Sequence, residues 1–190
     1  MLTKLYVDER IDYKQGIAFG NTGPYERITA NAFSDDSKAP AYIDLLRPRQ
    51  PAKANGTLLY VIGKGPEEKA LLEAGFMILR VRDDKPESVR DVVEFFRYGG
   101  TGILLLSDQR RYVKRAIAFA SGADARKLAA LAQGGFTKGD KDRPVFDVLW
   151  VHDSSLQIEP VPNGAKVHVT KGKPLDALAI QLHNQLSPAK

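Results

Sequence analysis

The chain has 190 residues, of which 43% are hydrophobic and 27% charged, enough for one globular domain with a substantial core. Its net charge of +5 permits an anionic partner without requiring one, and the absence of cysteine excludes disulfides and thiolate chemistry. No apolar run approaches the roughly 18 residues of a membrane span, so we expect no membrane partner.

The amino-terminal part is typical of short strands with alternating polarity, separated by turns. Strands are expected at Leu2–Ile11, Tyr25–Phe33 and Ala41–Leu46. Glycine, asparagine and proline mark the turn before the second strand, and the prolines after the third cannot join a central ladder. Alternation suits antiparallel strands with one solvated face, so the sequence predicts an antiparallel N-terminal edge.

Continuous apolar runs then alternate with helix-like segments. The expected strands are Thr57–Ile62, Phe76–Val81, Ala116–Ala120, Val145–Val151 and Val167–Thr170. The expected helices are Glu67–Ala74, Pro86–Tyr98, Asp124–Ala132 and Pro174–Leu186. Runs that are apolar on both sides suit parallel strands covered by helices on both faces. We therefore predict one α/β domain over residues 1–190, with a mixed, mainly parallel sheet in which the first four of these strands are parallel neighbours.

Five segments that occur in one order carry a family resemblance. They read FGNTGPYERITANAF, DLLRPRQPAKANGTLLYVIGKG, VRDVVEFFRYGG, RAIAFASGADARKL and GGFTKGDKDRPVFDVLWVH. From about Tyr6 to His152, the chain resembles the bacterial "alpha/beta hydrolase domain" family of uncharacterised, esterase-like proteins. The resemblance implies an α/β-hydrolase-like fold. Family chains are much longer, so the resemblance also implies a shortened relative. Residues 153–190 have no match in the family and form an unrelated tail that carries the final helix.

The family's nucleophile elbow is altered in this chain. It reads G-x-S-Q-S-G-R-F-L after an A-x-A-F strand, which corresponds here to Ala116–Phe119. The resemblance then places the nucleophile position on Gly122 and the following arginine on Arg126, which makes this a vestigial elbow and the protein a pseudoenzyme. The alternative is an ordinary glycine turn between a strand and a helix. An elbow residue has φ > 0, which glycine adopts at little cost, so we predict φ > 0 at Gly122.

Other candidate catalytic residues are weaker. Ser121 is offset by one position and is expected to cap the following helix, and Ser107 is interpreted as a loop serine or a helix cap. His152 ends a strand, but the adjacent Asp153 points to the opposite face and cannot orient it well. His183 lies beside an apolar helix face and is expected to be structural. No pair of histidines has metal-ligand spacing, so no metal is expected.

Two further features have alternative interpretations. The loop Gly63-Lys64-Gly65 follows a buried strand, so it could supply an oxyanion N–H donor, bind a carboxylate or phosphate, or be a simple turn. Nucleotide-binding motifs are incomplete there, and no cofactor is expected. The basic residues Arg110, Arg111, Lys114 and Arg115 are typical of a solvated charge run, so nucleic acid is not the expected partner.

The leading hypothesis is a non-catalytic α/β-hydrolase-like module that binds a small molecule or a protein partner. The alternative is a carboxylic-ester hydrolase that uses an offset serine. Nucleic-acid binding rests on the basic residues alone. Because part of the family's domain has no counterpart, apolar surface would be covered by Pro174–Leu186 or by a second subunit, as in a homodimer. The start lacks an apolar signal core, so a cytoplasmic location is expected, or a periplasmic or secreted one if a signal peptide was removed.

Overall fold

The computed structural model describes residues 1–35, 39–82, 85–99, 106–133, 144–152, 166–170 and 182. The strands are β1 (Leu2–Asp12), β2 (Ala18–Phe19), β3 (Gly23–Ser34), β4 (Ala41–Pro48), β5 (Thr57–Ile62), β6 (Met77–Val81), β7 (Arg115–Ser121), β8 (Val148–His152) and β9 (Lys166–Thr170). The α-helices are α1 (Glu68–Glu73), α2 (Pro86–Tyr98) and α3 (Asp124–Gln133), and the 3-10 helices are η1 (Tyr13–Gly16), η2 (Gly20–Thr22), η3 (Pro51–Lys53) and η4 (Ser107–Arg111).

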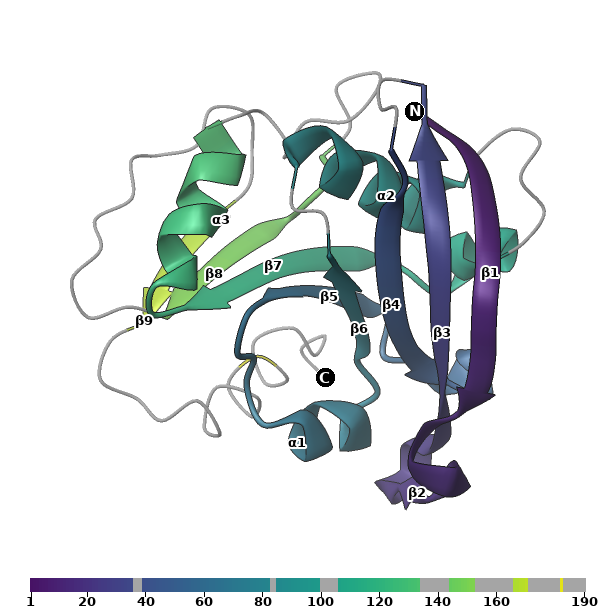
Figure 1. The fold of residues 1–190 in the computed structure, drawn as a ribbon. Helices are drawn as coiled ribbons and strands as arrows, with labels where there is room; N and C mark the ends of the chain where they lie inside the picture. Colours follow the sequence, from purple (N-terminus) through teal and green to yellow (C-terminus); the bar gives the residue numbers. More distant parts are fainter. Residues whose placement is uncertain are drawn as a thin grey trace.

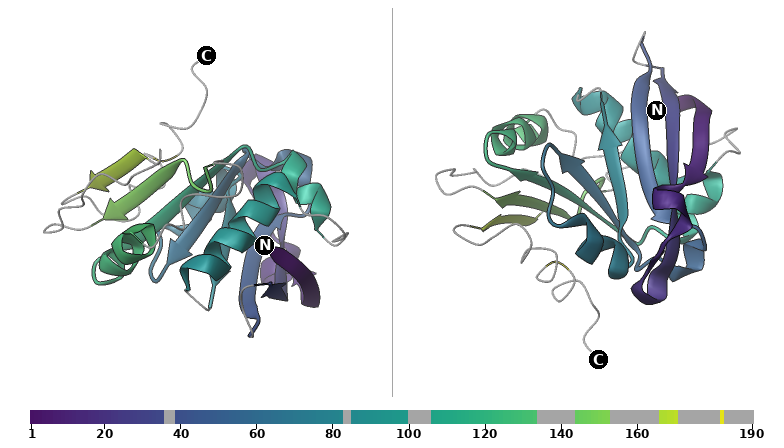
Figure 2. Two further views of the ribbon diagram at one scale, coloured as in Figure 1. Left: turned by 90° about the horizontal axis from the view of Figure 1, so that it is seen from above. Right: turned by 60° about the horizontal axis from the view of Figure 1, so that its bottom comes forward.

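One mixed sheet organises the described residues, in the order β1-β3-β4-β6-β5-β7-β8-β9 with β2 paired to β3. The predicted parallel neighbours are confirmed, because β6, β5, β7 and β8 pair in parallel. The antiparallel amino-terminal part is confirmed as well, and it extends through the antiparallel β4–β6 pair. A mainly parallel sheet is not confirmed, since half of the strand pairs in the described residues are antiparallel. Figures 1 and 2 show how the twist turns the two halves of the sheet across one another.

The eighth strand begins later than the sequence predicts, at Val148 rather than Val145. The reason lies at Asp147, whose carboxylate accepts a hydrogen bond from the Ala116 N–H at 3.0 Å. The Asp147 N–H in turn donates to the Ala116 carbonyl at 2.9 Å. These two bonds hold the entry of β8 against the start of β7, and regular pairing follows after them.

Alternate residues of β7 enter two separate cores. Ala116, Ala118 and Ala120 pack in one cluster with apolar residues of α2 and α3, among them Val89, Val92, Val93, Phe96, Ala125 and Leu128. Ile117 and Phe119 pack in the other cluster with Leu71 and Leu72 of α1 and with Leu182. The apolar face predicted for α2 is confirmed. The predicted helix Pro174–Leu186 lies outside the described residues apart from Leu182, which is helical and buried.

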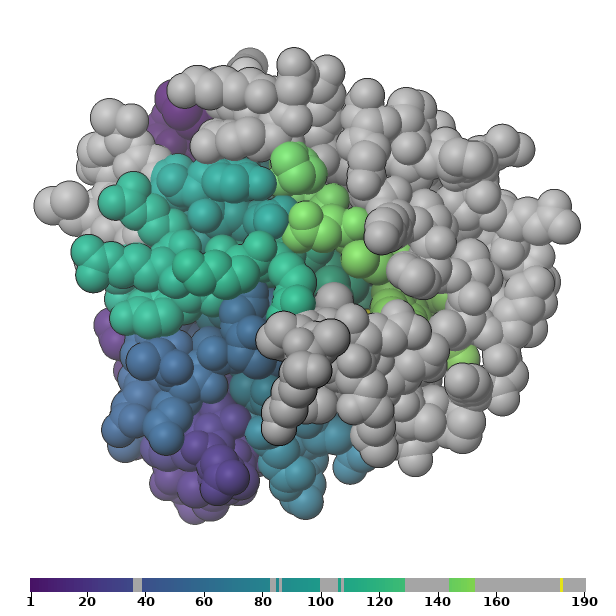
Figure 3. Space-filling model, turned by 180° about the vertical axis from the view of Figure 1, so that it is seen from behind, coloured from purple at the N-terminus to yellow at the C-terminus, as the bar shows by residue number. Residues whose placement is uncertain are grey.

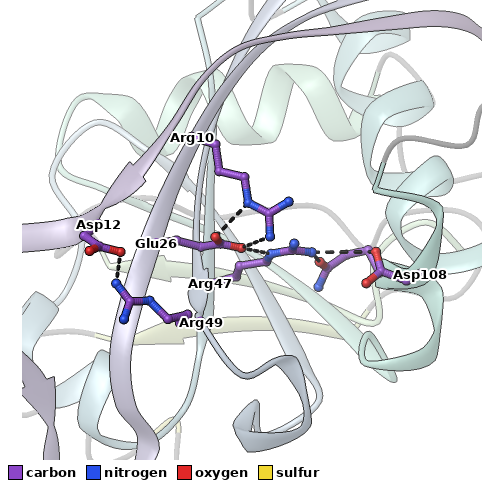
Figure 4. A network of polar contacts seen from close by, with 7 residues as sticks. Arg10, Asp12, Glu26, Arg47, Arg49 and Asp108 are labelled. Atoms are coloured by element: carbon purple, nitrogen blue, oxygen red, sulfur yellow. Dashed lines mark hydrogen bonds and ion pairs between the residues drawn. The ribbon is translucent and has the colours of Figure 1, made fainter. Parts of the chain in front are cut away.

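A largely buried ionic network joins β1, β3, β4 and η4 (Figure 4). Glu26 accepts hydrogen bonds from Arg47 Nε at 2.7 Å and from Arg10 Nε and Nη2 at 2.8 and 2.9 Å. The Arg47 side chain is only 3% exposed, and it also donates to the amide oxygen of buried Gln109 at 2.6 Å. Asp108 lies 3.7 Å from the same guanidinium. Glu26 is therefore the nearest compensating charge for a guanidinium that water scarcely reaches.

Candidate functional site

The turn between β7 and α3 adopts the geometry predicted for an elbow. Gly122 has φ of +56°, and its N–H donates to the His152 carbonyl at 2.9 Å. Its own carbonyl accepts from the Ala125 N–H at 3.1 Å, so the turn leads directly into α3. A Cβ at Gly122 would meet no atom within 4 Å. The backbone angle, not lack of space, is what favours glycine here.

Replacing Gly122 with serine tests this interpretation. We expect Gly122→Ser to destabilise the fold by about 1–3 kcal/mol, the usual range for a strained non-glycine residue, without creating an esterase. Gly122→Asn should cost less, because asparagine tolerates the left-handed region. Urea unfolding of both variants measures the difference. Equal stability of the serine variant and the natural chain would show that the turn does not require glycine.

Ser121 does not cap α3, contrary to the sequence prediction. The helix begins three residues later, at Asp124, and the Ser121 hydroxyl donates instead to the Lys64 carbonyl at 3.0 Å. Ser121 and His152 are register partners at the ends of β7 and β8, so their side chains leave the same face of the sheet. Sequence spacing alone did not predict this pairing, because it depends on the register of two strands that are far apart in the chain. Asp153 lies outside the described residues.

The Gly63–Gly65 loop is held in place from several sides. Arg80 Nη1 donates to the Gly63 carbonyl at 2.5 Å, and Ser121 holds the next carbonyl. Gly63 has φ of +68°, and a Cβ there would overlap the Asp124 carboxylate, with its Cγ 2.6 Å away. Helix α1 begins only at Glu68 and has six residues, so the loop does not sit at its amino terminus. The loop is a constrained strand-to-helix connection whose first two carbonyls accept side-chain hydrogen bonds.

A cleft of about 350 Å³ opens beside this loop, at the carboxyl ends of β5 and β6. Tyr42 and Asp44 of β4 line one side, Arg80 and Arg82 lie at the end of β6, and Asp124 belongs to α3. In α/β sheets, ligands bind outside the carboxyl ends of strands where the strand order reverses. Such a reversal occurs at β5, which has β6 on one side and β7 on the other.

A second cavity of about 190 Å³ adjoins the cleft and shares Asp44 and Arg80 with it. Tyr13 and Glu68 lie at its other end, where the Tyr13 hydroxyl donates to the Glu68 carboxylate. Burial, strengthened by this hydrogen bond, raises the pKa of Tyr13 to about 12. The phenol therefore stays protonated at neutral pH and keeps its donor role.

Sequence reasoning missed the charged residues of the cleft. Arg80 lies in the run FMILRV, which was interpreted as a buried strand, and Asp44 lies in the equally apolar Ala41–Leu46. A lone charge inside an otherwise apolar strand was the available signal, because such a charge marks a position that reaches solvent or has a partner. Arg27 on β3 supplies that partner for Asp44, with Nη2 to Oδ2 at 2.5 Å.

The remaining predicted site residues lie away from the cleft. Arg126 is exposed on α3, and Ser107 begins η4, which precedes the amino end of β7, opposite to Ser121. The basic residues of 110–115 lie at the amino end of β7 as well. Their segment reaches the surface beside the segment that precedes β5 (Figure 3). Within the described ranges, no acidic or histidine cluster could hold a metal ion, and no helix is long and apolar enough to cross a membrane.

No protein-family model matches the sequence, and no curated protein is significantly similar to it. Among solved structures, the chain is similar to a lipase/esterase from Lactobacillus plantarum, with a TM-score of 0.48 and 11% identity over 86% of this chain and 89% of that one. It is also similar to an esterase from Pyrobaculum calidifontis, with a TM-score of 0.38 and 13% identity over 78% of this chain and 46% of that one. A brefeldin A esterase, a bacterial homologue of human hormone-sensitive lipase, has a TM-score of 0.43 and 14% identity over 75% of this chain and 42% of its own. The chain thus spans less than half of the latter two.

The order and direction of the strands define the sheet. Counted from β3 and without β2, the described strands lie in the order 1-2-4-3-5-6-7. Strand β4, the second in this order, is antiparallel to its neighbours β3 and β6. Strands β6, β5, β7, β8 and β9 pair in parallel. The described residues therefore form a mixed α/β fold, in which β1 adds a further antiparallel edge strand to the sheet.

Proposed function

We propose that this protein is a non-catalytic, α/β-hydrolase-like module, with helices on both faces of its sheet, that binds a small molecule in the cleft beside Gly63–Gly65. The observation that carries the proposal is the elbow. The residue with positive φ at the turn, where an elbow holds its nucleophile, is Gly122, which has no side chain that could act as one. The cleft beside it, at about 350 Å³, has the size of a small-molecule site.

The surroundings of the elbow support the same function. A nucleophilic serine must give its proton to a base, yet the Ser121 hydroxyl donates to the Lys64 carbonyl, which cannot accept a proton in catalysis. The neighbouring Gly63 carbonyl accepts a hydrogen bond from the Arg80 guanidinium, so both carbonyls are held by side chains. These contacts stabilise the architecture of a former active site without providing an activated nucleophile.

One observation favours a second candidate, a carboxylic-ester hydrolase that uses Ser121. Ser121 and His152 are register partners on adjacent strands and leave the same face of the sheet. For this candidate to act, the Ser121 side chain must leave the Lys64 carbonyl and turn towards His152. The two candidates therefore differ in one testable property, which is the reactivity of Ser121.

Treatment with a fluorophosphonate, followed by mass mapping, separates the two candidates. For the non-catalytic module we expect no adduct on Ser121 or Ser107, and no saturable hydrolysis of p-nitrophenyl acetate above background. Ser121→Ala is the control and should behave like the natural chain. An adduct on Ser121, together with turnover that disappears in the alanine variant, would establish the esterase instead. A fragment screen by ligand-observed NMR then tests whether the cleft binds small molecules.

A further inference from the structure

We propose that the cleft binds a small organic anion whose charged head lies between Arg80 and Arg82 and whose apolar body packs against the strand ends. This inference rests on the proposed ligand-binding function and adds the chemical class of the ligand. A carboxylate and a phosphate share the chemistry that the cleft recognises.

Among the described residues that line the cleft, positive charge is in excess. Asp44 is neutralised by Arg27, which approaches it through Nε at 3.0 and 3.1 Å and through Nη2 at 2.5 Å. Of the other charged side chains that line the described part of the cleft, Arg80 and Arg82 are positive and Asp124 is negative. A ligand with an anionic group would balance this charge, whereas a cationic ligand would increase it.

The two arginines are held in position before any ligand arrives. Arg80 is held by its hydrogen bond to the Gly63 carbonyl. It also lies close to Gly65, since its Nη2 is 3.7 Å from the position that a Cβ of Gly65 would take. The Arg82 guanidinium lies 4.6 Å from the centre of the Tyr42 ring. Stacking uses the face of a guanidinium and leaves its edge to a ligand. Such edges bind carboxylate and phosphate groups with two parallel hydrogen bonds.

Apolar side chains supply the rest of the cleft. Val61 and Ile62 end β5 and Val81 ends β6, and these three residues belong to the lining of the cleft with exposed fractions of 3–9%. Tyr42, which is partly exposed, adds aromatic surface. A bare inorganic ion would leave the Tyr42 ring in contact with water. The cleft is therefore suited to an anion with an apolar body, and benzoate is the simplest probe of that kind.

The test is a titration of the isotope-labelled full chain with sodium benzoate and, in parallel, with benzamide, its neutral isostere, observed by NMR. We expect benzoate to shift the amide signals of Gly63–Gly65 and Arg82. Benzamide should bind at least about tenfold more weakly than benzoate. Arg82→Met should weaken benzoate binding about tenfold, and Arg82→Lys should weaken it less. Lys4→Met on the edge strand β1 removes one positive charge elsewhere and should leave the affinity unchanged. Melting temperatures confirm that each variant folds.

The possible outcomes separate this inference from the proposed function. Equal affinity for benzoate and benzamide, or neutral fragments that bind the cleft where benzoate does not, would overturn the anionic ligand and leave the ligand-binding module intact. Benzoate affinity that is unchanged in both Arg80→Met and Arg82→Met would overturn the assigned residues. If neither benzoate nor any fragment shifts the signals of the cleft, both the inference and the proposed function fail.

Discussion

Replacing Glu26 with glutamine should destabilise the protein by about 3 kcal/mol, as expected when one partner of a buried ion pair loses its charge. Arg47 would keep its positive charge at a side chain that is only 3% exposed, with its nearest carboxylate gone. The neutral hydrogen bond to Gln109 would remain, and the half-exposed Asp108 carboxylate at 3.7 Å would offset only part of the charge. For a chain of this length, the melting temperature should fall by roughly 10 °C. Urea unfolding and calorimetry measure both quantities.

Arg10 offers a matched control because it binds the same carboxylate from the solvent side. Its side chain is 55% exposed, so Arg10→Met should cost less than about 1 kcal/mol. The double variant Glu26→Gln with Arg47→Met should recover much of the lost stability, because it removes the buried positive charge together with its closest carboxylate. Equal losses for Arg10→Met and Glu26→Gln would show that burial does not determine the strength of this network.

Much of the fold could be predicted from the sequence wherever one segment determines its own structure. The helix Pro86–Tyr98 has the bounds that its spacing of apolar residues predicts. The apolar runs that became β5, β6 and β7 also lie where they were expected. In each case the pattern of burial repeats within a single element, so the sequence carries the information locally.

What could not be predicted depends on pairing between distant segments. An apolar run does not specify its neighbours, so the antiparallel β4–β6 pair was not foreseen, and the sheet was expected to be mainly parallel. The same pairing brings Asp44 beside Arg80, which creates the cleft. That Ser121 and His152 are partners across two strands likewise depends on the register of β7 and β8. The position of Gly122 was predictable, because a tight turn there requires a residue that adopts positive φ.

Gly63 lies where the loop after β5 comes closest to Asp124 of α3, beside the cleft. Gly63→Ala should destabilise the protein by about 2–3 kcal/mol for two separate reasons. Its φ of +68° strains any residue that carries a Cβ. The new methyl group would also overlap the Asp124 carboxylate, whose Cγ would stand 2.6 Å away, so that side chain must rotate out of its place in the cleft.

A double-mutant cycle separates the two reasons. In an Asp124→Ala background, the methyl group of Gly63→Ala meets no carboxylate, and only the backbone strain remains. We therefore expect Gly63→Ala to cost about 1 kcal/mol less in that background than in the natural chain, a coupling typical of residues in contact. Gly122→Ala should show no such coupling with Asp124→Ala, because a Cβ at Gly122 has nothing within 4 Å. Additive losses for Gly63 and Asp124, measured by urea unfolding, would mean that the loop moves away from α3 and that the carboxylate does not hold it.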